Sequence, residues 1–469
     1  MKKNFDKNIT KLKQRFVNFE IKNRWQNTIK IHKTPSGFVT ARYETVLLHS
    51  SYDPIKEANS LAQKVKTGDR VCLYGLGLGY HAEAILDRIG PDGQLILIEL
   101  NPDIISAALT LRDLTRLISD QRTFLITGTS EIEVATLLAR RMDSTQTETK
   151  EANLEVMFHA PSFKCIPKGF EQITNALEIL QIERRVPTIF GGLEQRNRAL
   201  NDEIVQNSRG LRSLHLSNLG KPAFMISAGP SLDDALPFLS TIKTKGIMAC
   251  VDTACPILLS HGIHPDYVFS LDPQDESFIF FQRYLDKALK LVCVPTANAK
   301  VLQFVTGEKF VAFKEGKITE QDEKISEQKG ITQAGGSVAC LGVDSLIQMG
   351  CGPIILVGQD CAFTGRRIYS RFSCAEEELT LHLGRTQTIA QAHWEKYNKR
   401  KQVPISCYGT GKTTTDQILY GYLRNIEQLA EANPETSFYN LFPHGAKINR
   451  VSPLGSINET LKILDGVRS

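Results

Sequence analysis

The stretch AFMISAGPSLDDALPFLSTI, residues 223–242, decides the fold of this 469-residue chain. It begins as a short apolar run, turns through Gly229 and Pro230, and continues with helix-like periodicity. A second apolar run, GIMACVD, follows and ends on Asp252. An acid about 20–25 residues beyond the first turn glycine is typical of nucleotide-binding α/β folds. The stretch therefore predicts a strand, a glycine turn, a helix and a parallel second strand.

The same plan occurs earlier in the chain, at residues 71–79. There VCLYGLGLG is followed by the helix-like YHAEAILDRI and by the strand-like QLILIEL, which contains Glu99. Glycine turns of this kind let the backbone approach a ligand, and the next helix presents free N–H groups to an anion. The arrangement resembles a methyltransferase cofactor site, but no Asn-Pro-Pro-Tyr-type catalytic motif follows. We expect Gly75, Gly77, Gly79 and Glu99 to form a scaffold turn or a non-catalytic pocket.

Alternating strands and helices continue through the second half of the chain, with the apolar runs YVFSLDP, LVCVP, KFVAFKE and PIILVGQDC. Strands that alternate with helices build mostly parallel sheets covered on both faces. We therefore predict an α/β protein with two Rossmann-like parallel-sheet domains in tandem. The expected divisions are an N-terminal segment (1–59), a Rossmann-like domain (60–185), a helical linker (186–222), a catalytic domain (223–450) and a C-terminal tail (451–469).

The composition excludes several functional classes. The 56 basic and 51 acidic residues give a net charge of +5, which is too small to indicate nucleic-acid binding. No apolar run reaches the roughly 18 residues of a membrane helix, and the charged N-terminus does not read as a signal peptide. Most of the ten cysteines stand in apolar runs, and none forms a CxxC pair. We expect a cytoplasmic protein without a membrane span, whose cysteines act as small hydrophobic residues.

Polar residues gather where the strands of the second domain are expected to end. Parallel strands share one carboxyl edge, and open α/β sheets bind ligands there. The residues at that edge are Ser231, Asp252, Asp272, Gln274, Ser337, Gln359 and Asp360. Their number indicates a binding site.

The order of five motifs in this region carries a family resemblance. The runs ISAGPSLDD, ACVDTACP, GIHPDYVFSLDPQ, QAGGSVACLGVDSLIQMG and PIILVGQDCAFTGRRIYS span about residues 215–450. They resemble the motility accessory factor family of bacterial flagellin glycosyltransferases. The region is also similar to one group of bacterial sialyltransferases and to an archaeal hydroxymethylpterin pyrophosphokinase. The fold alone therefore does not fix the reaction.

The resemblance implies transfer of a nonulosonic acid, of the pseudaminic or legionaminic type, from a CMP donor to serines and threonines of flagellin. The donor-binding residues would be Gly229, Pro230, Ser231, Asp252, Thr253, Asp272, Gln274, Gly335, Gly336, Ser337 and Gln359. A competing interpretation makes Asp252 the N-cap of a helix starting at Thr253, and Asp360 a loop-capping carboxylate. No cofactor or metal is required, although the two aspartates leave room for Mg²⁺.

The stretch YGTGKTTTD, residues 408–416, looks like the end of an ATP-binding P-loop, but Ser406 stands where the first glycine should be. In the sialyltransferases the corresponding glycine loop carries a histidine base ahead of a long helix, and here Thr410 takes that place. The remaining candidates for the base are Asp360, His382, His393 and Asp416. Lys412 would bind the donor phosphate or carboxylate from a mobile loop, or would be a solvent-exposed loop lysine.

Two alternatives to the glycosyltransferase remain from the sequence. One is a pyrophosphokinase that uses ATP and Mg²⁺ on a hydroxymethylpterin, and the other is a non-catalytic flagellar assembly factor. The loop FTGRRIYSRFS adds Arg366, Arg367 and Arg371, which either bind an acidic sugar or remain solvated.

Overall fold

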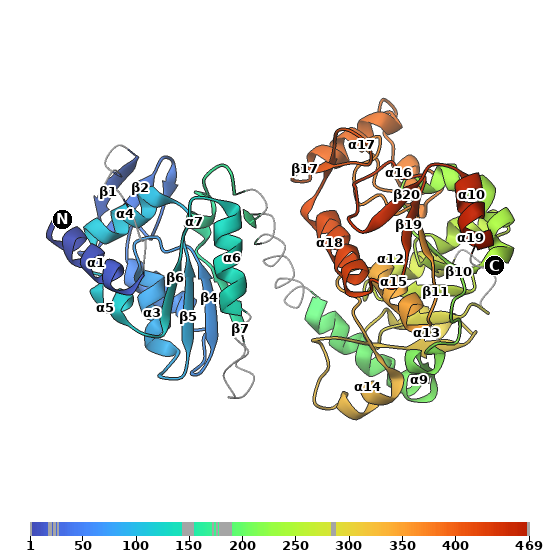
Figure 1. The fold of residues 1–469 in the computed structure, drawn as a ribbon, viewed down its shortest axis with the longest axis horizontal. Coiled ribbons are helices and arrows are strands. Elements are labelled where there is room, and N and C mark those ends of the chain that lie inside the picture. Colours follow the sequence, from blue (N-terminus) through green and yellow to red (C-terminus); the bar gives the residue numbers. More distant parts are fainter. Residues whose placement is uncertain are drawn as a thin grey trace. The chain divides into compact units, whose positions relative to one another are not determined.

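The computed structural model describes residues 2–16, 21, 25, 28–142, 154–170, 173–174, 177, 190–282 and 288–466. The chain divides into two compact units, Met1–Leu177 and Glu178–Ser469, and each has its own parallel sheet. Figure 1 shows the elements of both units. The predicted class, two α/β parallel-sheet domains in tandem, is confirmed.

The first unit carries a small antiparallel sheet ahead of a parallel one. Its elements are α1 (Lys2–Arg15), β1 (Ile29–Lys33), β2 (Val39–Tyr43), β3 (Val46–Leu47), α2 (Pro54–Ala62), β4 (Arg70–Tyr74), α3 (Tyr80–Arg88), β5 (Gln94–Ile98), α4 (Pro102–Leu111), α5 (Thr115–Ser119), β6 (Thr123–Ile126), α6 (Glu131–Met142), β7 (Leu154–Phe158) and α7 (Ala160–Phe163).

The parallel sheet of this unit has the strand order β6-β5-β4-β7. Successive side chains of a strand point to opposite faces, so each strand feeds two cores. Val71 and Leu73 of β4 pack into one hydrophobic cluster, whereas Cys72 and Tyr74 pack into the other. The continuous apolar runs of the sequence are therefore explained by burial on both faces.

The second unit is larger. Its elements are α9 (Asp202–Asn207), β8 (Arg209–Gly210), the 3₁₀ helix η2 (Leu211–Leu214), β9 (Ala223–Ile226), α10 (Leu232–Ile242), η3 (Lys243–Lys245), β10 (Ile247–Val251), α11 (Cys255–Ser260), β11 (Tyr267–Ser270), α12 (Asp275–Gln282), β12 (Leu291–Cys293), α13 (Ala299–Phe304), β13 (Lys309–Val311), β14 (Phe313–Lys314), α14 (Glu323–Lys329), β15 (Ile331–Thr332), α15 (Val338–Gln348), β16 (Ile354–Val357), α16 (Cys374–Leu381), α17 (Ile389–Asn398), β17 (Val403–Ser406), β18 (Lys412–Thr415), α18 (Gln417–Ala432), β19 (Phe438–Leu441), β20 (Val451–Leu454) and α19 (Ile457–Gly466).

Nine parallel strands form the main sheet of the second unit, in the order β20-β19-β16-β9-β10-β11-β12-β13-β8. From β9 the chain adds β10 to β13 on one side, and it then returns to add β16, β19 and β20 on the other. The strand order therefore reverses between β9 and β16. Such a switch point opens a crevice at the carboxyl ends of the strands.

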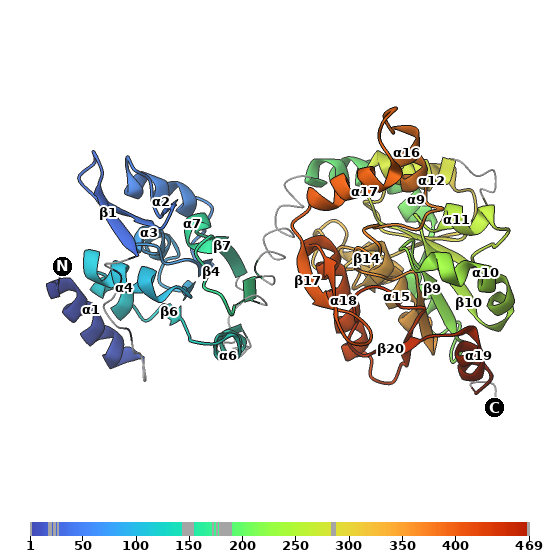
Figure 2. The same cartoon turned by 90° about the horizontal axis from the view of Figure 1, so that it is seen from above.

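Helices cover both faces of this sheet. In Figure 2, α15 and α18 lie on one side of β9 and β10, and α10 and α11 lie on the other. Helix α15 packs on β9, β10 and β11, and α18 packs beside α15. Both α15 and α18 begin near the carboxyl edge of the strands, which brings their first turns to the crevice.

The chain outside residues 223–450 contributes more structure than the sequence predicts. Within the stretch expected to be a helical linker, β8 forms an edge strand of the nine-stranded sheet. In the expected tail, β20 extends the opposite edge and α19 follows it. The ten cysteines are free, and all but Cys407 are buried. Among the described residues, no helix combines the length and apolarity needed to cross a bilayer.

Candidate functional site

A cavity of about 520 Å³ lies at the predicted carboxyl edge of the second unit. This volume is within the range of small-molecule sites. Its walls come from the turns after β9, β10, β11 and β16, from the first turns of α15 and α18, and from the segment after β14. The residues predicted for the site that line it are Gly229, Asp252, Thr253, Asp272, Gln274, Gly336, Ser337, Gln359 and Asp360.

Asp360 holds the glycine turn after β9 in place. Its carboxylate accepts hydrogen bonds from the Ser231 backbone N–H (3.0 Å) and hydroxyl (2.7 Å), and from the Thr364 hydroxyl (2.8 Å). A Cβ added to Gly229 would lie 2.4 Å from an Asp360 oxygen and 2.4 Å from the Gly358 carbonyl oxygen. The turn therefore needs glycine because the two strand ends approach so closely. Burial raises the pKa of Asp360.

Asp252, at the end of β10, is buried and satisfied by its own neighbours. It accepts hydrogen bonds from the Thr253 N–H (2.8 Å) and from the hydroxyls of Ser277 (3.2 Å) and Ser270 (3.4 Å). Burial raises its pKa to about 7, and the nearby charge of Asp272 adds to the shift. Helix α11 begins at Cys255 with Ala254 as its N-cap. Asp252 is therefore not the N-cap of α11, and its carboxylate is already hydrogen-bonded within the protein.

Asp272, after β11, is the most available carboxylate of the three. Its described partners are the backbone N–H (2.9 Å) and the side-chain amide (3.3 Å) of Gln274. Burial raises its pKa, but the residue is only partly buried. An ionised or protonated carboxyl that lines a cavity with few internal partners can bind hydroxyl or amino groups of a ligand.

The first turn of α15 supplies a place for an anion. Ser337 is the N-cap and its hydroxyl accepts a hydrogen bond from the Ala339 N–H (3.2 Å). Gly336, Ser337, Val338 and Ala339 all line the cavity. The N–H groups at a helix start and the positive end of the helix dipole favour a phosphate or carboxylate. Gly335 adopts a positive φ of 55° beneath this turn, and a Cβ there would lie 2.4 Å from Asn425.

One wall of the cavity carries residues that no sequence motif predicted. Tyr422 and Asn425 lie on α18 and line the cavity together with Tyr369. They are three residues apart on one helix, and burial raises the pKa of Tyr422 to about 12. The four-residue spacing of Ile418 and Tyr422, which places both on one face of the helix, was the sequence signal that could have indicated this wall. Aromatic rings beside a polar edge are suited to packing against a flat ring of a ligand.

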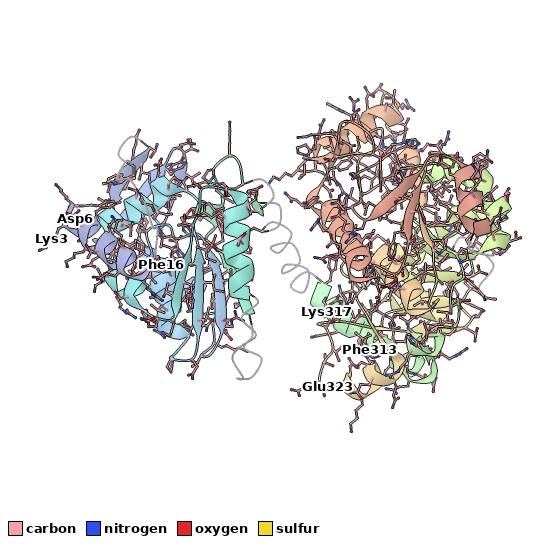
Figure 3. The ribbon with its side chains drawn as sticks, in the orientation of Figure 1. Lys3, Asp6, Phe16, Phe313, Lys317 and Glu323 are labelled. Atoms are coloured by element: carbon pink, nitrogen blue, oxygen red, sulfur yellow. The ribbon has the colours of Figure 1, made fainter. Side chains whose placement is uncertain are left out.

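Two lysines complete the lining, Lys314 at the end of β14 and Lys317 just beyond it. Figure 3 labels Lys317 in the loop between β14 and α14. The Lys317 ammonium binds both carboxylate oxygens of Glu194 at 3.0 Å. The cavity therefore combines carboxylates at the strand ends with cations and helix N–H groups on the facing side.

Several predicted residues do not line the cavity: Pro230, Ser231, Gly335, His382, Lys412 and Asp416. His382 is exposed at the end of α16. Asp416 is the N-cap of α18 and pairs with Arg400. His393, the other candidate base, pairs with Glu376 at 2.9 Å.

The P-loop-like stretch is a β-hairpin. Lys412 pairs with Ser406 across the antiparallel strands β17 and β18, and the glycines form the turn between them. The side chain of Lys412 is exposed on a strand rather than on a loop.

The three arginines of the loop 363–373 contact other residues of the protein. Arg367 and Arg371 bind the Asp233 carboxylate at 3.1 and 3.3 Å, and Arg366 lies 4.6 Å above the Trp394 ring. These contacts favour the structural interpretation of the loop over a sugar-binding one.

Backbone N–H groups of the glycine turn in the first unit are hydrogen-bonded to side chains of the same unit. Glu99 is fully buried and accepts hydrogen bonds from the N–H groups of Leu76 (3.0 Å) and Asn101 (3.1 Å). Burial raises the pKa of Glu99 to about 7. The Leu78 N–H donates to His49 Nε2 at 2.7 Å. Because these groups are already paired, the turn agrees with the predicted scaffold rather than with a ribose site.

Comparison with known proteins gives a family for part of the second unit. Residues 199–366 match the family model described as 6-hydroxymethylpterin diphosphokinase MptE-like. Two relatives are both described as uncharacterized proteins of Treponema pallidum (strain Nichols). One is 28% identical over 134 residues, which are 28% of this chain and 58% of that protein. The other is 28% identical over 221 residues, 45% of this chain and 72% of that protein.

The chain thus spans little more than half the length of the first relative. A solved structure, that of a MAf glycosyltransferase from Magnetospirillum magneticum AMB-1, covers 99% of this chain and 77% of its own. It is 15% identical, with a TM-score of 0.46. The family match falls on the segment in which the sequence motifs predict a hydroxymethylpterin pyrophosphokinase-like domain. Residues 199–366 of this chain are therefore similar to MptE-like domains.

Proposed function

We propose that the second unit is a glycosyltransferase that takes a nonulosonic acid, of the pseudaminic or legionaminic type, from a CMP donor. The acceptor would be a serine or threonine of flagellin in the cytoplasm. The sugar and the acceptor rest on the motif resemblance to motility accessory factors. The observation that carries the nucleotide part is the cavity itself, which joins the N-terminal turn of α15 to Asp272 and Gln274 on one edge.

This arrangement suits a nucleoside monophosphate linked to a sugar acid. The N–H groups of α15 can bind the single phosphate or the sugar carboxylate. Asp272 and Gln274 can bind ribose hydroxyls or the cytosine amino group. Tyr369 and Tyr422 offer ring faces for the base.

The proposed chemistry places modest demands on the protein. CMP is a good leaving group and the sugar carbon gains oxocarbenium character, so positioning and electrostatics matter more than strong acid catalysis. We assign Asp360 to positioning, because Ser231 and Thr364 already occupy its oxygens. No cofactor is assigned. Asp272 is an oxygen donor that suits Mg²⁺, whereas Asp252 is already hydrogen-bonded to Thr253, Ser270 and Ser277, and the proposed chemistry uses no step through a metal.

A second candidate function is a pyrophosphokinase that acts on a hydroxymethylpterin with ATP and Mg²⁺. The match of residues 199–366 to the MptE-like family favours it. The two functions differ in the protonation state that Asp252 would need in order to pair with the base. A protonated carboxyl pairs with the acceptor–donor edge of cytosine, whereas an ionised one pairs with the donor–donor edge of a pterin.

A thermal-shift panel with CMP, CDP, ATP–Mg²⁺ and S-adenosylmethionine tests the proposal, because a ligand that binds the folded state raises its apparent stability. We expect CMP and CDP to stabilise the second unit without metal. Stabilisation by ATP–Mg²⁺ alone would favour the pyrophosphokinase. No response to any of the nucleotides would favour the non-catalytic assembly factor.

A further inference from the structure

Three buried histidines meet at the carboxyl edge of the first unit's sheet. His49 follows β3, His81 is the second residue of α3, and His159 follows β7. Their ring centroids lie 4.7 Å (His49–His159), 4.8 Å (His81–His159) and 5.3 Å (His49–His81) apart. One ring nitrogen from each lies within 4.8 Å of the other two. The proposed function of the second unit uses none of these side chains.

The glycine turn of this unit makes room for the cluster. Gly77 has a φ of +51°, and a Cβ there would lie 2.5 Å from His49 Nε2 and 2.7 Å from His159 Cε1. The rings thus occupy the space beside the turn where a nucleotide-binding fold would admit its ligand. The GLGLG pattern is therefore accounted for by close approach of imidazoles rather than by a phosphate.

Each histidine has a ring nitrogen without a hydrogen-bond partner: His49 Nδ1, His81 Nδ1 and His159 Nε2. The three residues are only 2%, 4% and 2% exposed. An unpaired polar atom in such a position is destabilising, and proteins rarely leave three together. A bound ligand would satisfy such atoms.

The Nδ1 side of the His159 ring is fixed by Ser162. Its Nδ1 lies 2.8 Å from the Ser162 hydroxyl, which in turn hydrogen-bonds to the buried Glu99. The same Nδ1 also accepts the Ser162 backbone N–H at 3.4 Å, so a metal at Nε2 would have to displace the Nε2 proton. Metal-binding histidines commonly have such an outer partner.

The spacing of the rings agrees with a metal centre. Three imidazoles bound to Zn²⁺ at about 2.0–2.1 Å with tetrahedral angles have centroids about 5 Å apart. The observed separations of 4.7–5.3 Å bracket this value. The ligand nitrogens would then be about 3.3 Å apart, so small ring rotations must close the present separations.

We propose that His49, His81 and His159 form a binding site for a divalent transition metal, with Zn²⁺ as the best fit. Neutral imidazole nitrogens suit this class of ion better than Mg²⁺ or Ca²⁺, which prefer oxygen. Glu57 Oε2 lies 3.6 Å from His49 Nδ1, so a carboxylate stands next to the site and offsets part of the positive charge.

His49 is expected to be the weakest of the three ligands. Its Nε2 already accepts the Leu78 N–H, and its Nδ1 faces Glu57. One of these contacts must be given up when the metal binds. We therefore expect a larger loss of affinity from changes at His81 and His159 than from a change at His49.

The test uses the full-length protein, stripped with a chelator and then dialysed against Zn²⁺. Inductively coupled plasma mass spectrometry should give about one zinc per chain for the wild type. The variants His81→Gln and His159→Gln should lose at least tenfold in zinc affinity. His32→Gln, an exposed histidine of β1 in the same unit, is the matched control and should bind zinc like the wild type.

Cobalt gives a second measurement that does not depend on the variants folding. Co²⁺ bound by three imidazoles in a tetrahedral site should give intense visible absorption in the wild type, which zinc then displaces. Wild-type protein that takes up no zinc after stripping, or that shows only the weak spectrum of hydrated Co²⁺, would overturn the proposal. Folded His81→Gln and His159→Gln proteins with undiminished zinc affinity would overturn it as well.

Discussion

Replacing Asp252 by Asn should change how the stability of the second unit depends on pH. Burial raises the pKa of this carboxyl from 3.8 to about 7 in the folded state. A raised acid pKa means that the folded state favours the protonated form. The stability that the protonated Asp252 carboxyl contributes is therefore fully present below about pH 4 and is lost as the pH rises through about 7. Asn cannot ionise, and its amide can still pair with Thr253, Ser270 and Ser277.

The size of the effect follows from the shift. A change from 3.8 to about 7 corresponds to about 4 kcal/mol in the free energy of unfolding. Roughly 2–3 kcal/mol of this falls between pH 5 and pH 8. Asp252 is 3% exposed, so solvent screens little of it. As the pH rises from 5 to 8, the free energy of unfolding of the Asn variant should therefore increase by about 2–3 kcal/mol relative to that of the wild type.

The measurement is denaturant unfolding followed by tryptophan fluorescence at several pH values. The chain has two tryptophans, Trp25 in the first unit and Trp394 in the second. A Trp25→Phe background therefore reports the second unit alone. Asp465→Asn, at an exposed carboxylate of α19, is the control and should leave the pH dependence unchanged. A difference between Asp252→Asn and wild type that stays constant from pH 5 to pH 8 would refute the reasoning.

Three further predictions concern the cavity. Gly229→Ala should destabilise the second unit by about 1–3 kcal/mol and weaken CMP binding, because its Cβ would lie 2.4 Å from two oxygens. The control Gly384→Ala, whose Cβ would have nothing nearer than 4.0 Å, should do neither. Equal unfolding midpoints for the two variants would count against the argument. Asp272→Asn should weaken CMP binding by about 1–3 kcal/mol in calorimetry, whereas the exposed Asp275→Asn should not; unchanged affinity removes Asp272 from the site. Lys412→Met should alter CMP affinity less than twofold and leave ATP hydrolysis at background, because Lys412 is exposed outside the cavity lining; a tenfold loss would restore the donor-binding role.

The sequence predicted the sheets well because their signals are local. Apolar runs such as residues 354–357 are buried on both faces, and glycines follow β4, β9 and β16, where the strand end approaches a neighbour closely. Parallel pairing then brings the residues after each strand to one edge. For this reason Asp252, Asp272 and Asp360, far apart in the chain, could be predicted to line one site.

Other parts of the site depend on tertiary packing that no local pattern records. Tyr422 and Asn425 reach the cavity only because α18 packs beside α15. The three histidines of the first unit stand 32 and 78 residues apart and belong to no known spacing motif. Lys412 was expected on a mobile glycine loop, although the residues after it carry a local signal for a strand. The β-branched run at 413–415 favours a strand, and the structure has one there.

The central claim is that the second unit transfers a sugar acid from a CMP donor to flagellin. The most direct test incubates the protein with a CMP-activated nonulosonic acid and purified flagellin, and follows CMP release together with the intact mass of flagellin. The account predicts that the mass of flagellin rises in steps of one sugar residue, that CMP is released in equal amount, and that Asp272→Asn slows both. Flagellin of unchanged mass, together with diphosphate transfer from ATP–Mg²⁺ to a hydroxymethylpterin by the same protein, would contradict it.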